Sequence, residues 1–273
     1  MAGWRRSLMM TKKITASKFL FYLVVAAIIL FQMLPIIVLI FASFGKEGYL
    51  SFPPKSYSFR WYLEFFHSPA FVSAFMTSVK VSILTTAASL LLGAVSAYAI
   101  DRSPWRRVLT VFFCSPLMMP ALVIGLGLLQ WFRIMDVEIG FLTLFAGQLV
   151  ITLPYVVRGC LASLYRFNLS LEEAAQTLGC NRKQTFFYVT LPLMKPSLIA
   201  SGCFAFISSF GYLAVAIFLS SARTTTLPVR LYTYAMYTPD PIIAAISTCT
   251  LFLTLVFVVI IEKTSNINDM NTF

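Results

Sequence analysis

The chain has 273 residues, of which 59% are hydrophobic and 11% are charged, and its mean hydropathy is +0.84. Soluble domains carry about 25% charged residues, so this chain lacks the polar surface to face water on all sides. Only helices and closed β-barrels satisfy every backbone polar group in hydrocarbon. The apolar runs are long and unbroken rather than short and alternating, which predicts an all-α, polytopic membrane protein.

The formal net charge of +11 is spread between the apolar runs. A nucleic-acid-binding surface would instead gather its basic residues in one patch, so no nucleic acid is expected as a partner. The partner that the composition does indicate is the lipid bilayer.

Six stretches are long and apolar enough to cross a membrane as helices, which takes about 20 residues each. They are residues 19–44, 71–100, 108–132, 141–161, 196–220 and 242–261. The first is too long for the apolar region of a signal peptide, so it is expected to remain as a span. The third contains Pro116 and Pro120 and is expected to be kinked.

The distribution of basic residues predicts the orientation. With a cytoplasmic N-terminus, fourteen of the 21 lysines and arginines fall on the cytoplasmic side and six on the other, with Lys80 inside a span. Cytoplasmic loops carry the excess of basic residues, so both termini are expected in the cytoplasm. The chain then divides into residues 1–70 (a cytoplasmic segment, the first span and an external loop), a core of five spans over 71–262, and a short cytoplasmic tail over 263–273.

Several kinds of chemistry are missing from the sequence. The five cysteines are isolated, which predicts neither a disulfide framework nor a zinc site. No phosphate-binding GxxxxGK[ST] string, HExxH or GxSxG motif occurs. We therefore expect no catalytic residue, no metal site and no cofactor on this chain.

The longest predicted cytoplasmic loop spans residues 162–195 and has helix signals of its own. Ser170 as an N-cap with Glu173 three residues later predicts a capping box, and Gly179 is suited to end that helix in a left-handed turn. A second short helix over about 183–189 is expected to stop at Pro192. The loop is therefore expected to form two short helices at the cytoplasmic face.

The same loop resembles the cytoplasmic motif of type I binding-protein-dependent ABC importer permeases: Glu-Ala-Ala, three residues, Gly, nine residues, then an aliphatic residue, any residue, Leu and Pro. The chain has Glu173-Ala174-Ala175, Gly179 and Val189-Thr190-Leu191-Pro192 at that spacing, with Val189 where isoleucine is usual. The resemblance implies that the first short helix is a coupling helix that docks into a cleft on an ATPase made as another chain. The residues it assigns to ATPase coupling are Glu172, Glu173, Ala174, Ala175, Gly179, Leu191 and Pro192.

The likeness covers about residues 60–262 and is closest to the polyamine (spermidine/putrescine) branch, through the string at 225–230 and the entry to the last span at 241–248. Permeases of that branch usually carry acidic residues in the fifth span, where this chain has Ser209-Phe210-Gly211-Tyr212. Acidic residues within spans are usually functional, and without them a polyamine cation would meet no opposite charge in the fifth span. Both a polyamine and a 2-aminoethylphosphonate-like solute are therefore candidates. The residues expected to line the solute path are Ser208, Ser209, Gly211 and Tyr212.

The resemblance also implies a set of partners in a bacterial inner (plasma) membrane. They are two copies of a cytoplasmic ATPase that carries ATP and Mg, a similar or identical second permease subunit, and a periplasmic or external binding protein. A secondary transporter or channel without an ATPase is the alternative, and in it the loop at 170–192 would have no partner. Such transporters normally bury ionisable groups for a coupling ion, whereas the predicted spans contain no Asp or Glu.

Overall fold

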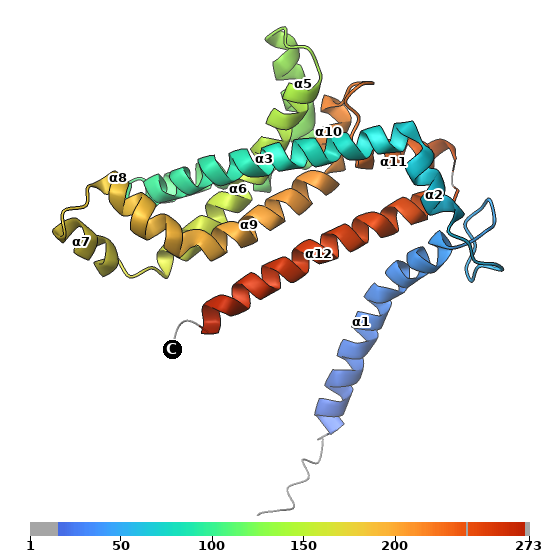
Figure 1. The fold of residues 1–273 in the computed structure, drawn as a ribbon, viewed down its shortest axis with the longest axis horizontal. Helices are drawn as coiled ribbons and strands as arrows, with labels where there is room; N and C mark the ends of the chain where they lie inside the picture. The colour runs from blue at the N-terminus through green and yellow to red at the C-terminus, as the bar shows by residue number, and fades with distance from the viewer. Residues whose placement is uncertain (1–15, 239, 271–273) are drawn as a thin grey trace, which may run out of the picture.

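The computed structural model describes residues 16–238 and 240–270 (Figure 1). The helices are α1 (Ala16–Ser43), α2 (Arg60–His67), α3 (Pro69–Asp101), α4 (Arg106–Cys114), η1 (Ser115–Met118), α5 (Ala121–Ile134), α6 (Phe141–Tyr165), α7 (Ser170–Thr177), α8 (Arg182–Thr185), η2 (Phe186–Thr190), α9 (Leu191–Gly211), α10 (Leu213–Leu219), α11 (Leu227–Tyr237) and α12 (Ile242–Met270). The first fifteen residues of the expected N-terminal segment and residues 271–273 of the expected tail lie outside the described part.

Four of the six predicted spans correspond closely to single long helices. They are α1, α3, α6 and α12, which cover the stretches 19–44, 71–100, 141–161 and 242–261. Within the described residues, five helices are long and apolar enough to cross a membrane, and α4 with α5 makes a sixth span if the two halves are counted together. The predicted all-α membrane fold is confirmed.

The third predicted span, 108–132, is broken more sharply than a kink. Its two halves, α4–η1 and α5, meet at an angle of 99°. The prolines explain the break, because Pro116 and Pro120 have no N–H to continue the helical hydrogen bonds. Between them, Met119 has extended backbone, with φ −92° and ψ 143°.

The fifth span is displaced from its predicted position at 196–220. A helical stretch runs from Arg182 through α8, η2 and α9 to Gly211, so the expected stop at Pro192 is wrong. Pro192 lies within this stretch, two residues after the π-helical turn of η2, where the regular helical hydrogen-bond pattern is already interrupted. At the other end, Tyr212 is extended (φ −81°, ψ 104°) and separates α9 from α10.

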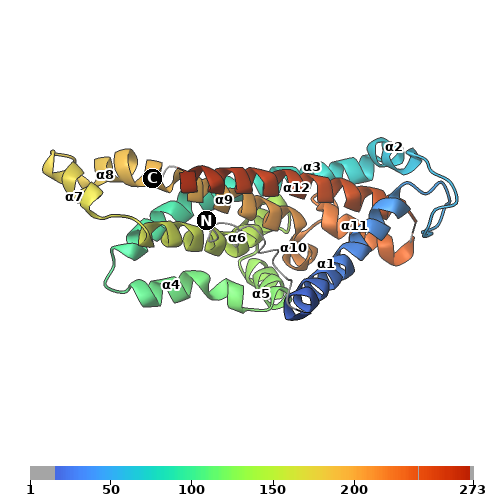
Figure 2. The same ribbon diagram turned by 90° about the horizontal axis from the view of Figure 1, so that it is seen from below.

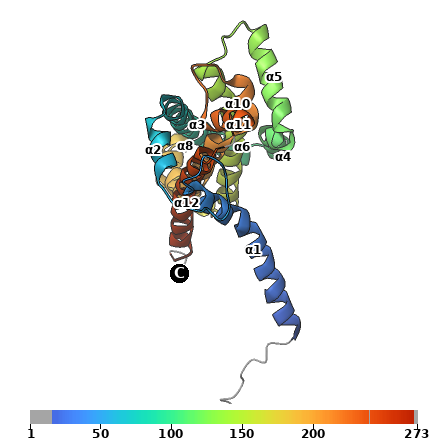
Figure 3. The same ribbon diagram turned by 90° about the vertical axis from the view of Figure 1, so that its right-hand side faces the viewer.

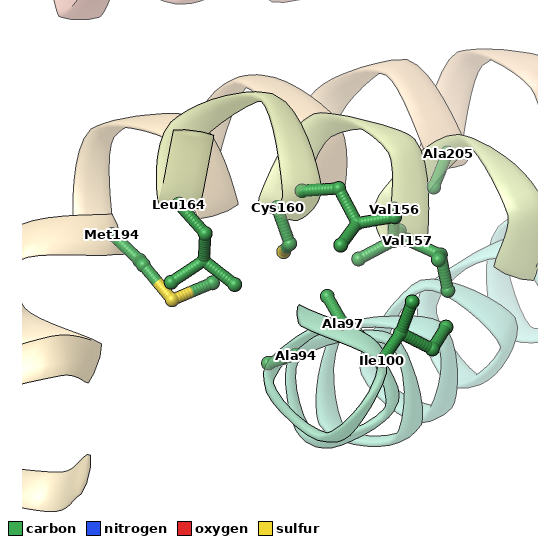
Figure 4. Close-up of a cluster of buried hydrophobic side chains, with 10 residues drawn as sticks. Ala94, Ala97, Ile100, Val156, Val157, Cys160, Leu164, Met194 and Ala205 are labelled. Atoms are coloured by element: carbon green, nitrogen blue, oxygen red, sulfur yellow. The ribbon is translucent and has the colours of Figure 1, made fainter. Parts of the chain in front are cut away.

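The centre of the bundle is formed by α3, α6 and α9. Their buried side chains are mostly small or aliphatic, including Ala97, Val156 and Ala205 (Figure 4). A Cβ atom on Gly93 of α3 would lie 2.7 Å from the Val156 Cγ1 atom of α6. Small residues let membrane helices approach closely and gain dispersion energy, so these three helices make a tightly packed core.

The remaining helices are placed at the two ends and along the side of this core. Helices α7 and α8 lie at one end, and α2 lies at the other (Figure 2). There the segment after α1 folds back, with the Trp61 indole N–H donating to the Gly45 carbonyl at 2.8 Å. Helix α1 diverges from the bundle (Figure 3), and none of its most apolar window is buried within the chain.

Candidate functional site

Helix α7 begins one residue earlier than its sequence pattern predicts. The N-cap is Leu169, not Ser170, and it makes no side-chain cap. The side-chain oxygen of Asn168 accepts a hydrogen bond from the Ser170 N–H at 3.1 Å instead. The predicted Ser170–Glu173 capping box is therefore wrong, and the third helical position belongs to Glu172, whose carboxylate is held elsewhere.

The end of α7 is a tight left-handed turn at Gly179, as the sequence predicts. Gly179 has φ +96°. Its N–H donates to the Gln176 carbonyl, and the Cys180 N–H donates to the Ala175 carbonyl, both at 3.0 Å. This pair of hydrogen bonds is the Schellman motif, which satisfies carbonyls left free at a helix end.

The next short helix, α8, has a capping box that the sequence analysis missed. The Gln184 N–H donates to the Asn181 side chain, and the Asn181 N–H donates to the Gln184 side chain, both at 2.9 Å. The Asn-x-x-Gln spacing is a variant of the known signature. Together, the turn at Gly179 and this box fix how α7 projects from the end of the bundle.

Glu172 is held inside the protein by two different elements. Its side chain is only 5% exposed. The Arg102 guanidinium, just after α3, donates to the Glu172 Oε2 atom at 2.6 Å. The Thr190 hydroxyl, at the end of η2, donates to the Glu172 Oε1 atom at 2.6 Å. One carboxylate therefore connects α7 to α3 and to the start of α9.

Arg102 is itself held in place by further contacts. Its guanidinium pairs with Asp101 and lies 5.2 Å from the ring centre of Tyr98. Burial lowers the pKa of Arg102, but the hydrogen bond and charge of Glu172, together with the charges of Asp101 and Tyr98, outweigh it, so the net pKa is raised. Arg102 therefore stays cationic, and Glu172 keeps a charged partner.

A second arginine extends this network to α6. Arg106 lies 3.6 Å from the Asp101 carboxylate, its Nε–H donates to the Tyr165 hydroxyl at 3.2 Å, and its guanidinium lies 3.9 Å from the centre of that ring. A cleft of about 540 Å³ remains between this network and α7, and Glu173 and Gln176 are among its lining residues.

The outward side of α7 is unusual because it exposes apolar groups at the end of the bundle. Glu173 and Ala174 are exposed and Ala175 is half-buried. Leu171 is also exposed, and Leu178, directly after the helix, is 88% exposed. All eight residues of α7 are described, and Glu172 is the one buried side chain among them.

The other two residues of the motif do not join this surface. Leu191 is half-buried and Pro192 is exposed, and both lie in the first turn of α9. The structure therefore divides the predicted coupling residues into four groups: the buried Glu172, the remaining residues of α7, the turn at Gly179, and the beginning of α9.

The predicted solute-path residues lie at the break of the fifth span, and the structure adds Gln148 to them. The Gln148 side-chain amide of α6 lies 3.5 Å from the Tyr212 carbonyl. Gln148 Oε1 and the Ser209 hydroxyl are buried without a partner, while Ser208 is half-buried and Gly211 exposed. An amide within an apolar span is the sequence signal that could have identified Gln148.

Among the described residues, no group of three His, Cys, Asp or Glu side chains is placed to hold a metal ion. The network at α7 consists of salt bridges and hydrogen bonds between side chains that are already paired. The network therefore connects helices through noncovalent contacts.

Long apolar helices that carry a short, exposed helix at one end are the arrangement of a polytopic membrane protein. The chain belongs to the family of binding-protein-dependent transport system inner membrane components, whose model matches residues 89–263. It is thus a multi-pass inner-membrane protein and the permease subunit of an ABC importer, which works with a binding protein and an ATPase.

Curated relatives support the same family. The spermidine/putrescine transport system permease protein PotC of Haemophilus influenzae is 26% identical over 86% of this chain and 92% of that protein. The putrescine transport system permease protein PotI of Escherichia coli K12 is 29% identical over 78% of this chain and 79% of that protein.

Solved structures show the same fold. A chain of a bacterial ABC transporter involved in the import of the acidic polysaccharide alginate has a TM-score of 0.69 at 19% identity, covering 91% of this chain and 98% of that chain. A chain of the MetNI methionine ABC transporter, in an inward-facing conformation, has a TM-score of 0.56 at 15% identity, covering 74% of this chain and 94% of that chain.

Proposed function

We propose that this permease forms half of a translocation pore and that α7 is the helix through which an ATPase drives it. The observation that carries this proposal is the exposed surface of α7, on which Glu173, Ala174 and the almost fully exposed Leu178 are open to a partner. The exposed residues Leu171, Ala174 and Leu178 recur at i, i+3 and i+7 and so share one side of the helix, and an exposed apolar patch rimmed by polar residues is typical of a surface that another protein covers. The carboxylate of Glu173 is free to meet a basic group on that partner.

The ATPase, in two copies, carries the ATP and Mg that power the transport. In this scheme its closure on ATP displaces α7 and opens the pore outward, and the spans return after hydrolysis. This requires α7 and both termini to be cytoplasmic, as the distribution of basic residues predicts. No residue of the permease takes part in covalent chemistry.

The other half of the pore is a second permease subunit, similar or identical. Helix α1 supports this arrangement, because none of its most apolar window is buried against the rest of the chain. Its apolar surface is therefore available both to lipid and to the second subunit. A periplasmic binding protein delivers the solute at the opposite end of the bundle from α7.

The solute is a small organic amine, with a polyamine as the first candidate. Two curated relatives with 26–29% identity are permeases of spermidine or putrescine systems. The absence of Asp and Glu from the fifth span favours a second candidate, 2-aminoethylphosphonate, whose ammonium group is balanced by its own phosphonate. Gln148, Ser209 and the Tyr212 carbonyl offer uncharged hydrogen-bonding groups to either solute.

The test is to purify the permease with its ATPase, second subunit and binding protein in lipid nanodiscs and to measure ATP hydrolysis with each solute. We expect the loaded binding protein to raise the rate, with putrescine or spermidine most effective. Stimulation by 2-aminoethylphosphonate alone would support the second candidate. If no ATPase co-purifies and none can be reconstituted, the proposed function is wrong.

A further inference from the structure

The two adjacent glutamates of α7 differ in their burial. Glu173 is exposed on the surface assigned to the ATPase, whereas Glu172 is turned inward to Arg102 and Thr190. Resting on the proposed function, we infer that Glu172, Arg102 and Thr190 form a joint that transmits the displacement of α7 to the spans. In this division Glu173 contacts the partner, and Glu172 is a positioning residue that moves the permease itself.

Helix α7 has few other buried contacts with the rest of the bundle. No apolar side chain of α7 is buried, and Leu171 faces outward. Apart from its covalent links, the turns at 166–169 and 178–181, the buried side chain of Glu172 is the contact that connects α7 to the end of α3. A displacement of α7 therefore reaches α3 through Glu172.

The hydrogen bonds from Arg102 and Thr190 to Glu172 are strong and lead to different helices. Both are 2.6 Å long and involve an ionised carboxylate, which makes them charge-assisted and among the strongest hydrogen bonds in proteins. Burial strengthens them further, because the local dielectric is low. One bond leads to the end of α3 and the other to the residue before α9, so two of the three core helices are connected to α7 together.

The arginine of this joint, Arg102, is held in place by contacts of its own. Arg102 is fixed by Asp101 and by the ring of Tyr98, and Asp101 is in turn close to Arg106. Coupling between sites is carried by contiguous hydrogen-bond and salt-bridge networks that connect rigid elements. The carboxylate of Glu172, bonded to an Arg102 that is itself paired with Asp101, is such a network.

The experiment compares two variants with the same chemical change at neighbouring positions, Glu172→Gln and Glu173→Gln, in the complete transporter reconstituted in liposomes. The quantity measured is the number of solute molecules imported per ATP hydrolysed. Because the amide of Glu172→Gln loses the charge that binds Arg102, we expect this ratio to fall about tenfold, within the usual range of coupling between sites. Glu173→Gln should reduce the amount of ATPase recovered with the permease and leave the ratio unchanged in the complexes that form.

Two further variants keep the test decisive if Glu172→Gln does not fold. Thr190→Val removes one of the two bonds and should lower the ratio, while Thr190→Ser retains the hydroxyl and should restore it. The double variant Arg102→Gln with Glu172→Gln should be no worse than either single one, because both remove the same interaction. A wild-type ratio in Glu172→Gln, or in a folded Thr190→Val, would overturn the joint. Absence of ATP-driven import by the unmodified transporter would instead refute the proposed function.

Discussion

Replacing Glu173 with lysine is expected to abolish solute uptake while the permease still folds and inserts. Glu173 is exposed on α7 and has no buried contact to lose, so the substitution should leave the stability of the chain nearly unchanged. At the ATPase surface, however, it would place a cation where the partner is expected to present one. If Glu173 is a hot spot of the interface, its change costs about 2 kcal/mol or more, which is about 30-fold in affinity.

The measurement is the uptake of labelled solute by cells, together with the amount of ATPase that co-purifies. Glu173→Asp is the matched control, because it retains a carboxylate at the same exposed position of α7. Normal uptake by the Glu173→Lys variant would show that α7 does not dock the ATPase through this residue.

Gly179→Val is expected to cause a comparable loss of uptake through the backbone. Gly179 has φ +96°, a conformation that side-chain-bearing residues rarely adopt. A left-handed conformation costs roughly 1–2 kcal/mol for an ordinary residue, and a β-branched side chain is among the least suited to it. The turn after α7 would then open, and the Schellman hydrogen bonds of Gly179 and Cys180 would be lost.

The control at the same position is Gly179→Asn, because asparagine tolerates left-handed backbone better than other residues. A Cβ atom on Gly179 would meet nothing within 4 Å, so steric collision does not explain any difference between the two variants. We expect uptake to be largely retained with asparagine and mostly lost with valine. Equal uptake by the two variants would mean that the geometry of this turn does not matter for transport.

Much of the fold could be predicted from hydropathy, because a membrane span is a local property of about 20 residues. The spans α1, α3, α6 and α12 follow directly from the apolar runs. The third and fifth spans were less accurate: Pro116 and Pro120 predicted a kink but not a break of 99°, and Tyr212 interrupts the fifth span without any change in composition. Hydropathy reports which segments prefer lipid, and it does not register where the helix is broken.

In the candidate site, too, features set by neighbouring residues could be predicted, and contacts between distant residues could not. The turn at Gly179 was predictable, since glycine after a helix is a local signal. The inward orientation of Glu172 was not, because its partner Arg102 lies 70 residues away and Thr190 lies 18 residues away. The incorrect capping box has a local cause: the N-cap is Leu169, so Ser170 is already the first helical residue and its side chain does not cap the helix.

The central claim, that the outward surface of α7 docks an ATPase in the cytoplasm, is tested most directly by labelling Leu178→Cys. The native thiol at Cys180 is half-buried nearby, so the variant is best made together with Cys180→Ser. We expect a membrane-impermeant maleimide to label Leu178→Cys in inside-out vesicles stripped of the ATPase, and labelling to fall strongly once the ATPase is added back. Labelling that is unaffected by the ATPase, or that occurs only from the outer face of the membrane, would contradict the account.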